Sequence, residues 1–265
     1  MISKTFRIAR MIVLASFALS SAAWAAPCSN ASLSGTYGFL HGGRDAHGDP
    51  ASAVTQVTFD STTGTYRGED TENIDGVMVP SSVTATYIVA KNCTVTAKVR
   101  VVSGGQAENV NVSFVVTSTG FLFLFQKPGG ISSGFGVKQG SPTCTNAGVT
   151  GRFGFETTGV FVAGAPATGP LAFIGELKLK VDPSGEGVIS GHIAASEDGT
   201  ILTFADEPVT GSYKVDADCR GKATIAPKGQ PEMHFSFVVV DDGKEMLAVE
   251  TDADTVVDGT LVKRD

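Results

Sequence analysis

Two long segments of this 265-residue chain can be laid over one another, and this duplication constrains the fold more than any other feature. Both segments open alike, with CSNASLSGTYGF at 28–39 and CTNAGVTGRFGF at 144–155. Each continues with a Tyr-x-Val-x-x-x-Cys stretch, which ends at Cys93 and Cys219, and then with NVSFVVT or HFSFVVV. Because the matches keep their order over a domain-sized period, they predict two tandem copies of one domain.

The four cysteines lie at equivalent places, one at the start and one in the middle of each copy. An even number of cysteines in an exported chain indicates disulfides, and four cysteines allow three pairings. The duplication favours Cys28–Cys93 and Cys144–Cys219, one bond in each copy. A reactive redox pair is the alternative, but the sequence contains no Cys-x-x-Cys.

The first 25 residues have the three regions of a secretory signal peptide in their usual order. Basic residues precede a short apolar run at 11–19, and Ala23-Trp24-Ala25 fits cleavage near Ala25. The apolar run is shorter than the roughly 20 residues that span a bilayer. We therefore expect an exported protein, periplasmic or extracellular, without a membrane span.

Each copy has the residue pattern of antiparallel β-strands. Val, Thr, Phe and Gly are frequent, and apolar and polar residues alternate, as in 176–181, where Leu177 and Leu179 share one face. We predict about eight short strands per copy. Because each strand has one apolar face, the sheet must close on itself or fold into a sandwich. We favour an all-β fold of two up-and-down β-barrels, at 26–140 and 141–265, each with one disulfide.

Gly35-Thr-Tyr37 and Gly151-Arg-Phe153 resemble the Gly-x-aromatic opening of calycin-type barrels, although calycins have Trp at the aromatic position. In that family a basic residue on the last strand packs across the aromatic ring, a role that the resemblance gives to Lys138, Lys263 or Arg264. Barrels of the allene-oxide-cyclase type are similar in size and strand count. More broadly, the chain resembles a group of uncharacterised exported bacterial proteins with a Ser-Gly-Thr-Tyr-Gly-Phe opening, which implies no particular activity.

The loop after the first predicted strand carries the densest set of chemically reactive side chains. His41, Asp45, His47 and Asp49 place two imidazoles and two carboxylates within nine residues. Such side chains bind Zn²⁺ and other divalent ions. The second copy lacks this set, and the spacing fits no established metal motif. We therefore favour a solvated loop at the mouth of the barrel, keep the four residues as metal candidates, and predict no cofactor.

The segment 120–125 is apolar on both faces. In the second copy, charged residues of 244–250 fall in register with its phenylalanines, so we expect Phe121, Phe123 and Phe125 to point outward. An outward aromatic row indicates an interface, either between the two barrels or with a protein partner, including a second copy of the chain. If the strand parity is the reverse, the three rings line the lumen and shape an apolar cavity.

Charge narrows the range of partners. The segment 27–140 contains 7 basic and 8 acidic residues, and 141–265 contains 10 and 19. An acidic surface repels phosphate, so we expect neither nucleic acid nor anionic membranes as partners. The leading hypothesis is a non-catalytic protein that binds a small apolar ligand. The alternatives are a structural or protein-interaction module and an isomerase or cyclase, ranked last because inward positions such as Val95 and Ala97 are small and apolar.

Overall fold

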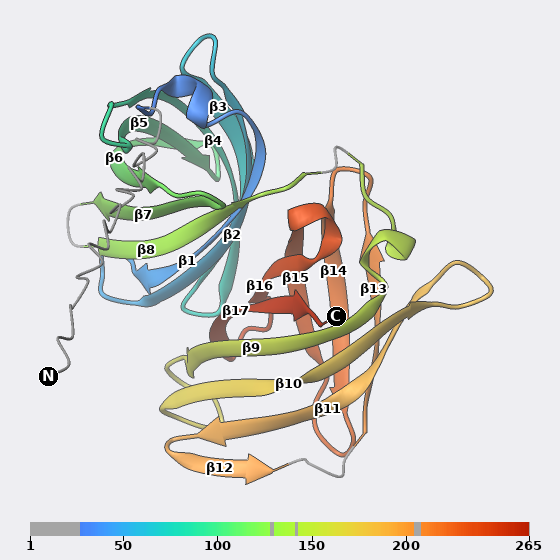
Figure 1. Ribbon diagram of the computed structural model, residues 1–265. Helices are drawn as coiled ribbons and strands as arrows, with labels where there is room; N and C mark the ends of the chain where they lie inside the picture. Colours follow the sequence, from blue (N-terminus) through green and yellow to red (C-terminus); the bar gives the residue numbers. More distant parts are fainter. Residues whose placement is uncertain (1–26, 128–129, 141–142, 204–207, 265) are drawn as a thin grey trace, which may run out of the picture.

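The computed structural model describes residues 27–127, 130–140, 143–203 and 208–264, so the predicted signal peptide at 1–25 lies outside the described residues. The described chain forms two antiparallel β-barrels that lie side by side (Figure 1). The predicted fold class is therefore confirmed. Within the described ranges, no helix is long and apolar enough to cross a membrane.

Barrel one is a closed ring of eight strands in sequence order, preceded by a 3₁₀ turn. Its elements are η1 (Asn30–Ser32), β1 (Gly35–Arg44), β2 (Pro50–Asp60), β3 (Thr65–Ile74), β4 (Val77–Val89), β5 (Thr94–Ser103), β6 (Gln106–Val116), β7 (Gly120–Lys127) and β8 (Gly130–Lys138). Strand β1 pairs with both β2 and β8, which closes the ring.

Barrel two repeats this plan. Its elements are η2 (Asn146–Val149), β9 (Gly151–Phe161), β10 (Pro170–Val181), β11 (Gly187–Glu197), β12 (Thr200–Thr203), β13 (Val209–Val215), β14 (Arg220–Pro227), β15 (Met233–Val240), η3 (Asp241–Gly243), β16 (Glu245–Glu250) and β17 (Thr255–Lys263). Strand β10 pairs with both β9 and β11, so eight strands close the barrel. The short β12 pairs with β11 as the first part of β4 pairs with β3, since Thr200 is opposite Glu197 as Val77 is opposite Ile74, so β12 and β13 together take the place of β4.

Short turns with a left-handed backbone join several neighbouring strands. Asp75-Gly76, Gly104-Gly105 and Asp198-Gly199 all have positive φ at both residues. This is the backbone of a type I′ hairpin turn, whose twist matches that of the flanking strands and which Gly and Asp tolerate. Local turn chemistry therefore sets the register of these three hairpins.

Both predicted disulfides are present. Cys28 is bonded to Cys93 across 65 residues, and Cys144 is bonded to Cys219 across 75 residues. Each bond joins the segment before the first strand of a barrel to the turn after its fourth or fifth strand. The pairing inferred from the duplication is confirmed.

The same side-chain contact anchors the 3₁₀ turn of each barrel beside the disulfide. The Asn30 side chain accepts a hydrogen bond from the N–H of Val89 at 2.9 Å. Asn146 accepts one from the N–H of Val215 at 2.8 Å. The two copies therefore share the structure of this end of the barrel.

A basic residue packs across the opening aromatic ring in each barrel. The Nζ of Lys138 lies 5.9 Å from the ring centroid of Tyr37, and that of Lys263 lies 6.0 Å from the centroid of Phe153. Arg264 instead forms an ion pair with a glutamate on β10. The packing expected from the resemblance occurs, while the relation to calycins stays a prediction.

The phenylalanines of β7 point into barrel one, so the predicted outward aromatic row is wrong. Phe121 is 1% exposed and Phe123 is 9% exposed, and the half-buried Phe125 packs against the same core. Leu122 and Leu124 are the exposed residues of this strand. The reverse parity, in which the rings line the lumen, is the correct one.

The reason for this error lies in barrel two. Leu247 and Val249 on β16 face out of their barrel, yet both are fully buried because barrel one covers them. An outward row covered in this way has the same sequence pattern as a core row. Glu250 on the inward row is also buried, and the hydroxyl of Thr255 donates a hydrogen bond to its carboxylate at 2.7 Å. A charged residue in this register therefore did not mark a solvent-facing side.

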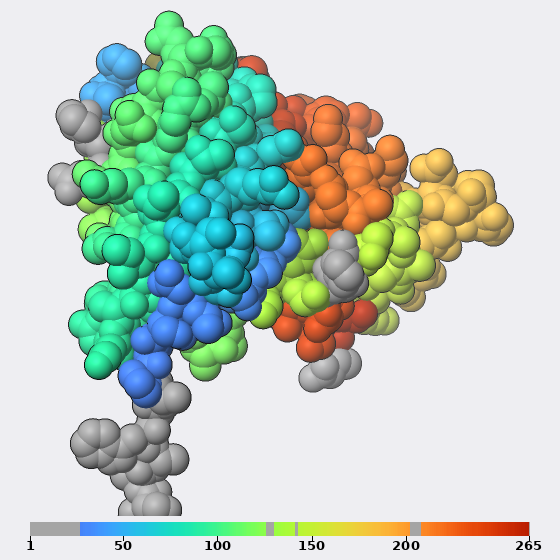
Figure 2. All heavy atoms as spheres, turned by 90° about the horizontal axis from the view of Figure 1, so that it is seen from above, coloured from blue at the N-terminus to red at the C-terminus, as the bar shows by residue number. Residues whose placement is uncertain are grey.

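The two barrels pack through a separate hydrophobic cluster, in which β15 and β16 of barrel two lie on β1, β2 and β8 of barrel one. Figure 2 shows the two barrels in direct contact. The members of this inter-barrel cluster are Leu40, Val54, Val238, Val240, Leu247 and Val249, with Phe135 and Val137 packed against it. Burial of apolar area at this contact holds the barrels in one arrangement.

A buried amide adds specificity to the contact between the barrels. Asn73 on β3 is inaccessible to solvent. Its side-chain N–H groups donate to the carbonyl oxygens of Glu250 at 3.0 Å and Thr255 at 2.9 Å, while its oxygen accepts from the N–H of Gly76 at 2.9 Å. At the rim, Arg220 of barrel two pairs with Glu69 of barrel one.

Candidate functional site

Barrel one contains a cavity of about 100 Å³ at the end opposite its disulfide, which leaves room for several water molecules. It is lined by both aromatic and acidic side chains. The lining residues are Phe39, His41, Thr55, Tyr66, Asp70, Glu72, Val99, Val101, Glu108, Val112, Phe114, Phe123 and Phe125. This combination gives the cavity an apolar floor and a polar mouth.

The floor is a cluster of rings that fills the middle of barrel one. The ring of Phe39 meets that of Phe121 edge to face, with centroids 4.5 Å apart, and lies 5.6 Å from that of Phe123. Ring pairs at these separations stabilise a core beyond their buried area alone. The cluster blocks the lumen at this level, so the cavity has one open end.

Asp70 is the principal polar group of the cavity. Its carboxylate accepts a hydrogen bond from the hydroxyl of Thr55 at 2.7 Å and one from that of Ser81 at 3.4 Å. Burial raises the pKa of Asp70 to about 6, although both hydrogen bonds act to lower it. The group is therefore largely ionised at neutral pH and accepts a proton in mildly acidic conditions.

His41 on β1 is separated from Glu72 on β3 by strand β2 alone, since Ala53 pairs with both residues. Its ring lies edge to face against Phe123, with centroids 5.7 Å apart. Burial lowers the pKa of His41, and the charge of Glu72 only partly opposes this effect. The imidazole is thus neutral at pH 7. Its Nδ1 is buried and has no hydrogen-bond partner in the described chain, an arrangement that calls for a water or ligand atom.

The structure separates the four metal candidates into two places. His41 faces the lumen, whereas Asp45, His47 and Asp49 lie together in the β1–β2 loop at the same open end, with ligand atoms within 4.8 Å of one another. Asp45 accepts hydrogen bonds from the N–H groups of His47 at 2.7 Å and Asp49 at 3.0 Å. This is an Asx turn, which accounts for the proximity of the three side chains. Metal binding in this loop stays a prediction.

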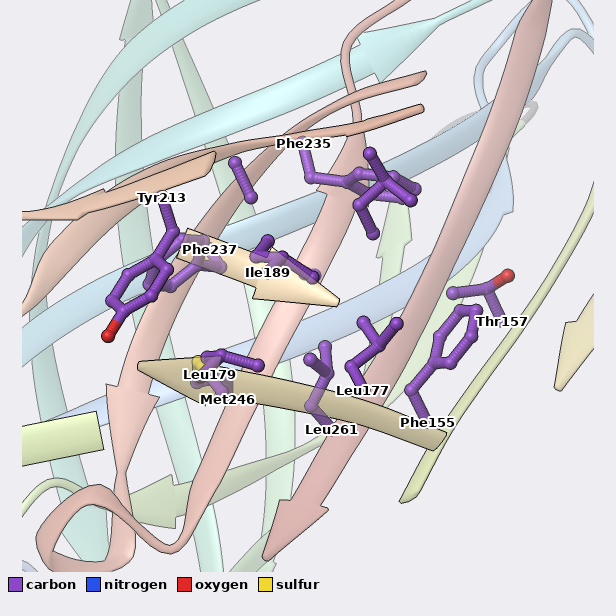
Figure 3. Close-up of a pocket in the computed structure, with 13 residues that line it drawn as sticks. Phe155, Thr157, Leu177, Leu179, Ile189, Tyr213, Phe235, Phe237, Met246 and Leu261 are labelled. Atoms are coloured by element: carbon purple, nitrogen blue, oxygen red, sulfur yellow. The ribbon is translucent and has the colours of Figure 1, made fainter. Parts of the chain in front are cut away.

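Barrel two offers much less space. Its cavity is about 30 Å³, which is enough for one or two water molecules. Figure 3 shows the labelled side chains, among them Phe155, Leu177, Phe235 and Met246, pointing toward one another from several strands. The lumen of barrel two is therefore a filled hydrophobic core, and the two copies differ in this respect.

Sequence reasoning missed the polar mouth of barrel one. The acidic stretch Glu69-Asp70-Thr-Glu72 reads as a solvated turn, but it lies in the middle of β3. Asp70 and Glu72 continue the inward row that begins at Tyr66, while Glu69 faces barrel two. Period-two counting from Tyr66 could have found them. The premise that the inward residues are small and apolar is therefore wrong for this end of barrel one.

No family model and no curated protein matches the chain. Two solved structures are similar to it. One is a protein of unknown function from the DUF3598 family of Nostoc punctiforme, with a TM-score of 0.27 and 11% identity over 88% of this chain and 97% of that chain. The other is a β-barrel-like DUF1849 protein from Brucella abortus, with a TM-score of 0.21 and 12% identity over 88% of this chain and 98% of that chain.

Proposed function

We propose that this protein is an exported, non-catalytic binding protein that holds a small molecule in the open end of barrel one. The observation that carries the proposal is the cavity of about 100 Å³ in which Asp70 and a neutral His41 face the rings of Phe123 and Phe125. Binding sites for small molecules are commonly apolar cavities with a few convergent polar groups. The two disulfides support export, because such bonds persist in oxidising compartments.

The charge of the cavity narrows the ligand to a small organic cation with an apolar body. Three carboxylates, those of Asp70, Glu72 and Glu108, line it, and none of the described side chains that line it is a lysine or arginine. Aromatic rings attract ammonium groups through their negative faces. The carboxylate of Asp70 accepts hydrogen bonds from Thr55, Ser81 and the backbone N–H of Thr71, and its two oxygens have about four acceptor sites, so it keeps acceptor capacity for an N–H donor of the ligand.

Titration calorimetry on the mature protein would test this proposal with small alkylammonium ions, their uncharged alcohol isosteres and the matching carboxylates. We expect the ammonium ions alone to bind. The variant Asp70→Asn should weaken their binding about tenfold or more, because a hydrogen bond to a charged group contributes about 1.5–3 kcal/mol. This variant should still fold, since it removes a buried carboxylate whose pKa is raised.

Asp60→Asn, at the exposed β2–β3 turn on the far end of barrel one, is the matched control and should leave binding unchanged. Equal binding of the uncharged isosteres, or full binding by Asp70→Asn, would contradict the proposed ligand class. Native mass spectrometry of protein purified from its own host adds an independent readout. A discrete mass excess that disappears on denaturation supports a resident ligand and gives its mass.

A further inference from the structure

One outward row of apolar side chains in barrel two packs against the other barrel, whereas the equivalent row in barrel one is exposed to solvent. On barrel two the inter-barrel cluster consists of Val238, Val240, Leu247 and Val249. All but Val240, whose counterpart is Thr117, have an apolar counterpart in barrel one. The strand registers give their counterparts, since Val238 is opposite Leu247 and Val115 is opposite Leu122. The counterparts Val115, Leu122 and Leu124, here called the β6–β7 patch, are 49%, 57% and 47% exposed. Barrel one therefore keeps the apolar contact row without a neighbour on it.

The face that receives this row is also duplicated. On barrel one the receiving residues are Leu40, Val54, Phe135 and Val137. The pairing registers make Glu156, Ile174, Thr260 and Val262 their counterparts on barrel two, so two of the four positions stay apolar. Ile174 is 61% exposed and Val262 is 51% exposed. Both line an open groove of about 850 Å³ on the outside of barrel two, here called the β9–β10–β17 groove. Barrel two thus presents a partly apolar receiving face that no segment of the described chain covers.

A glycine in each receiving face marks the point of close approach. A Cβ added to Gly38 would come within 2.6 Å of a γ carbon of Val240 and 2.9 Å of one of Val238. Its counterpart Gly154 has no atom of the described residues within 4 Å of the same position. Glycine inside a strand weakens the strand and often marks a place where another chain segment approaches closely. In barrel two that space is open.

Charge favours contact between unlike barrels. Barrel one, within 27–140, has a net charge of −1, whereas barrel two, within 141–265, has a net charge of −9. Contact between two copies of barrel two would bring like charges together. Exposed Lys98 lies on the outward row of β5 that begins at Thr94, the partner of Val115. The groove contains Glu156 beside the ion pair of Glu176 with Arg264, so the two surfaces also carry opposite local charges.

We propose that a second copy of this chain seats its β6–β7 patch in the β9–β10–β17 groove, so that the contact inside one molecule is repeated between molecules. Such a head-to-tail contact uses different surfaces on the two copies, and it generates rings or open chains. Within one molecule, the covalent link between the barrels raises their effective concentration into the millimolar range. A contact between two molecules has no such link and depends on the protein concentration. We therefore expect association at high protein concentration.

Sedimentation velocity of the mature protein, up to about 1 mM, would test the proposal. The average mass of the unmodified protein should rise with concentration. Leu122→Asp, which damages the patch, and Ile174→Asp, which damages the groove, should each be monomeric alone. Their equimolar mixture should form a 1:1 dimer and stop there, because Leu122→Asp retains the groove and Ile174→Asp retains the patch.

The control variant is Ile88→Asp. Ile88 is 70% exposed, but its counterpart in barrel two is Lys214, which lies outside the inter-barrel cluster. This variant should associate as the unmodified protein does. A protein that stays monomeric throughout would overturn the proposal. Association abolished by Leu122→Asp but untouched by Ile174→Asp would also overturn it, since that result indicates a symmetric dimer through two patches.

Discussion

Gly38 lies directly beneath Val240, so close that a methyl group added to Gly38 would approach a γ carbon of Val240 to 2.6 Å. The two residues belong to different barrels, and their contact brings β1 against the end of β15. An outward position on a barrel strand rarely requires the smallest residue. Here the requirement comes from the neighbouring barrel and has no cause within barrel one.

Gly38→Ala should destabilise the protein by about 1–3 kcal/mol, because extra atoms in a well-packed contact force neighbours out of place. Gly154→Ala is the matched control, with open space at the same position of barrel two. It should be neutral or more stable by about 0.5–1 kcal/mol, since glycine is costly inside a strand. Urea unfolding at low protein concentration measures both. Equal effects at the two sites would show that the close approach has no energetic consequence.

Asn73→Ala should lower the free energy of unfolding by about 2–4 kcal/mol. The substitution removes three hydrogen bonds of a fully buried amide and leaves the carbonyl groups of Glu250 and Thr255 without these donors. We expect barrel two to separate from barrel one before either unfolds. Hydrogen exchange followed residue by residue should show earlier exchange at Gly76 and along the inter-barrel cluster. A loss of protection spread evenly over both barrels would contradict this expectation.

Glu250 should make the stability of the protein depend on pH. Burial raises its pKa to about 7, with a further increase from Asp252, while Thr255 and His234 oppose it. Between the ordinary value of 4.5 and about 7, the folded chain binds more protons than the unfolded chain. The free energy of unfolding therefore falls as pH rises through this window and levels off above it.

Glu250→Gln removes that proton uptake while keeping an acceptor for the hydroxyl of Thr255. We expect the variant to be more stable than the unmodified protein at pH 8, by about 2–3 kcal/mol, and similar to it near pH 4. Denaturant unfolding at a series of pH values measures the difference. Glu186→Gln, at an exposed position, controls for the loss of one negative charge. A constant difference at every pH would show that Glu250 has an ordinary pKa.

Much of the candidate site could not be predicted from the sequence because its residues belong to different strands. Phe123 on β7 and His41 on β1 meet only because β8 lies between their strands and the barrel closes. The inward direction of Asp70 follows from the parity of β3, which an acidic stretch does not reveal. The sequence did identify His41, but it grouped that residue with the loop candidates Asp45, His47 and Asp49.

The sequence by itself determined the duplication, the pairing of the four cysteines and the all-β fold. It also determined the inward rows that include Val57, Phe114 and Phe237, since each of these rows alternates with polar residues. Only the tertiary structure decided the parity of β7, because that strand is apolar on both faces. A row of apolar residues has the same pattern whether it faces a lumen, a neighbouring barrel or a vacant surface, and only the packed arrangement distinguishes these three.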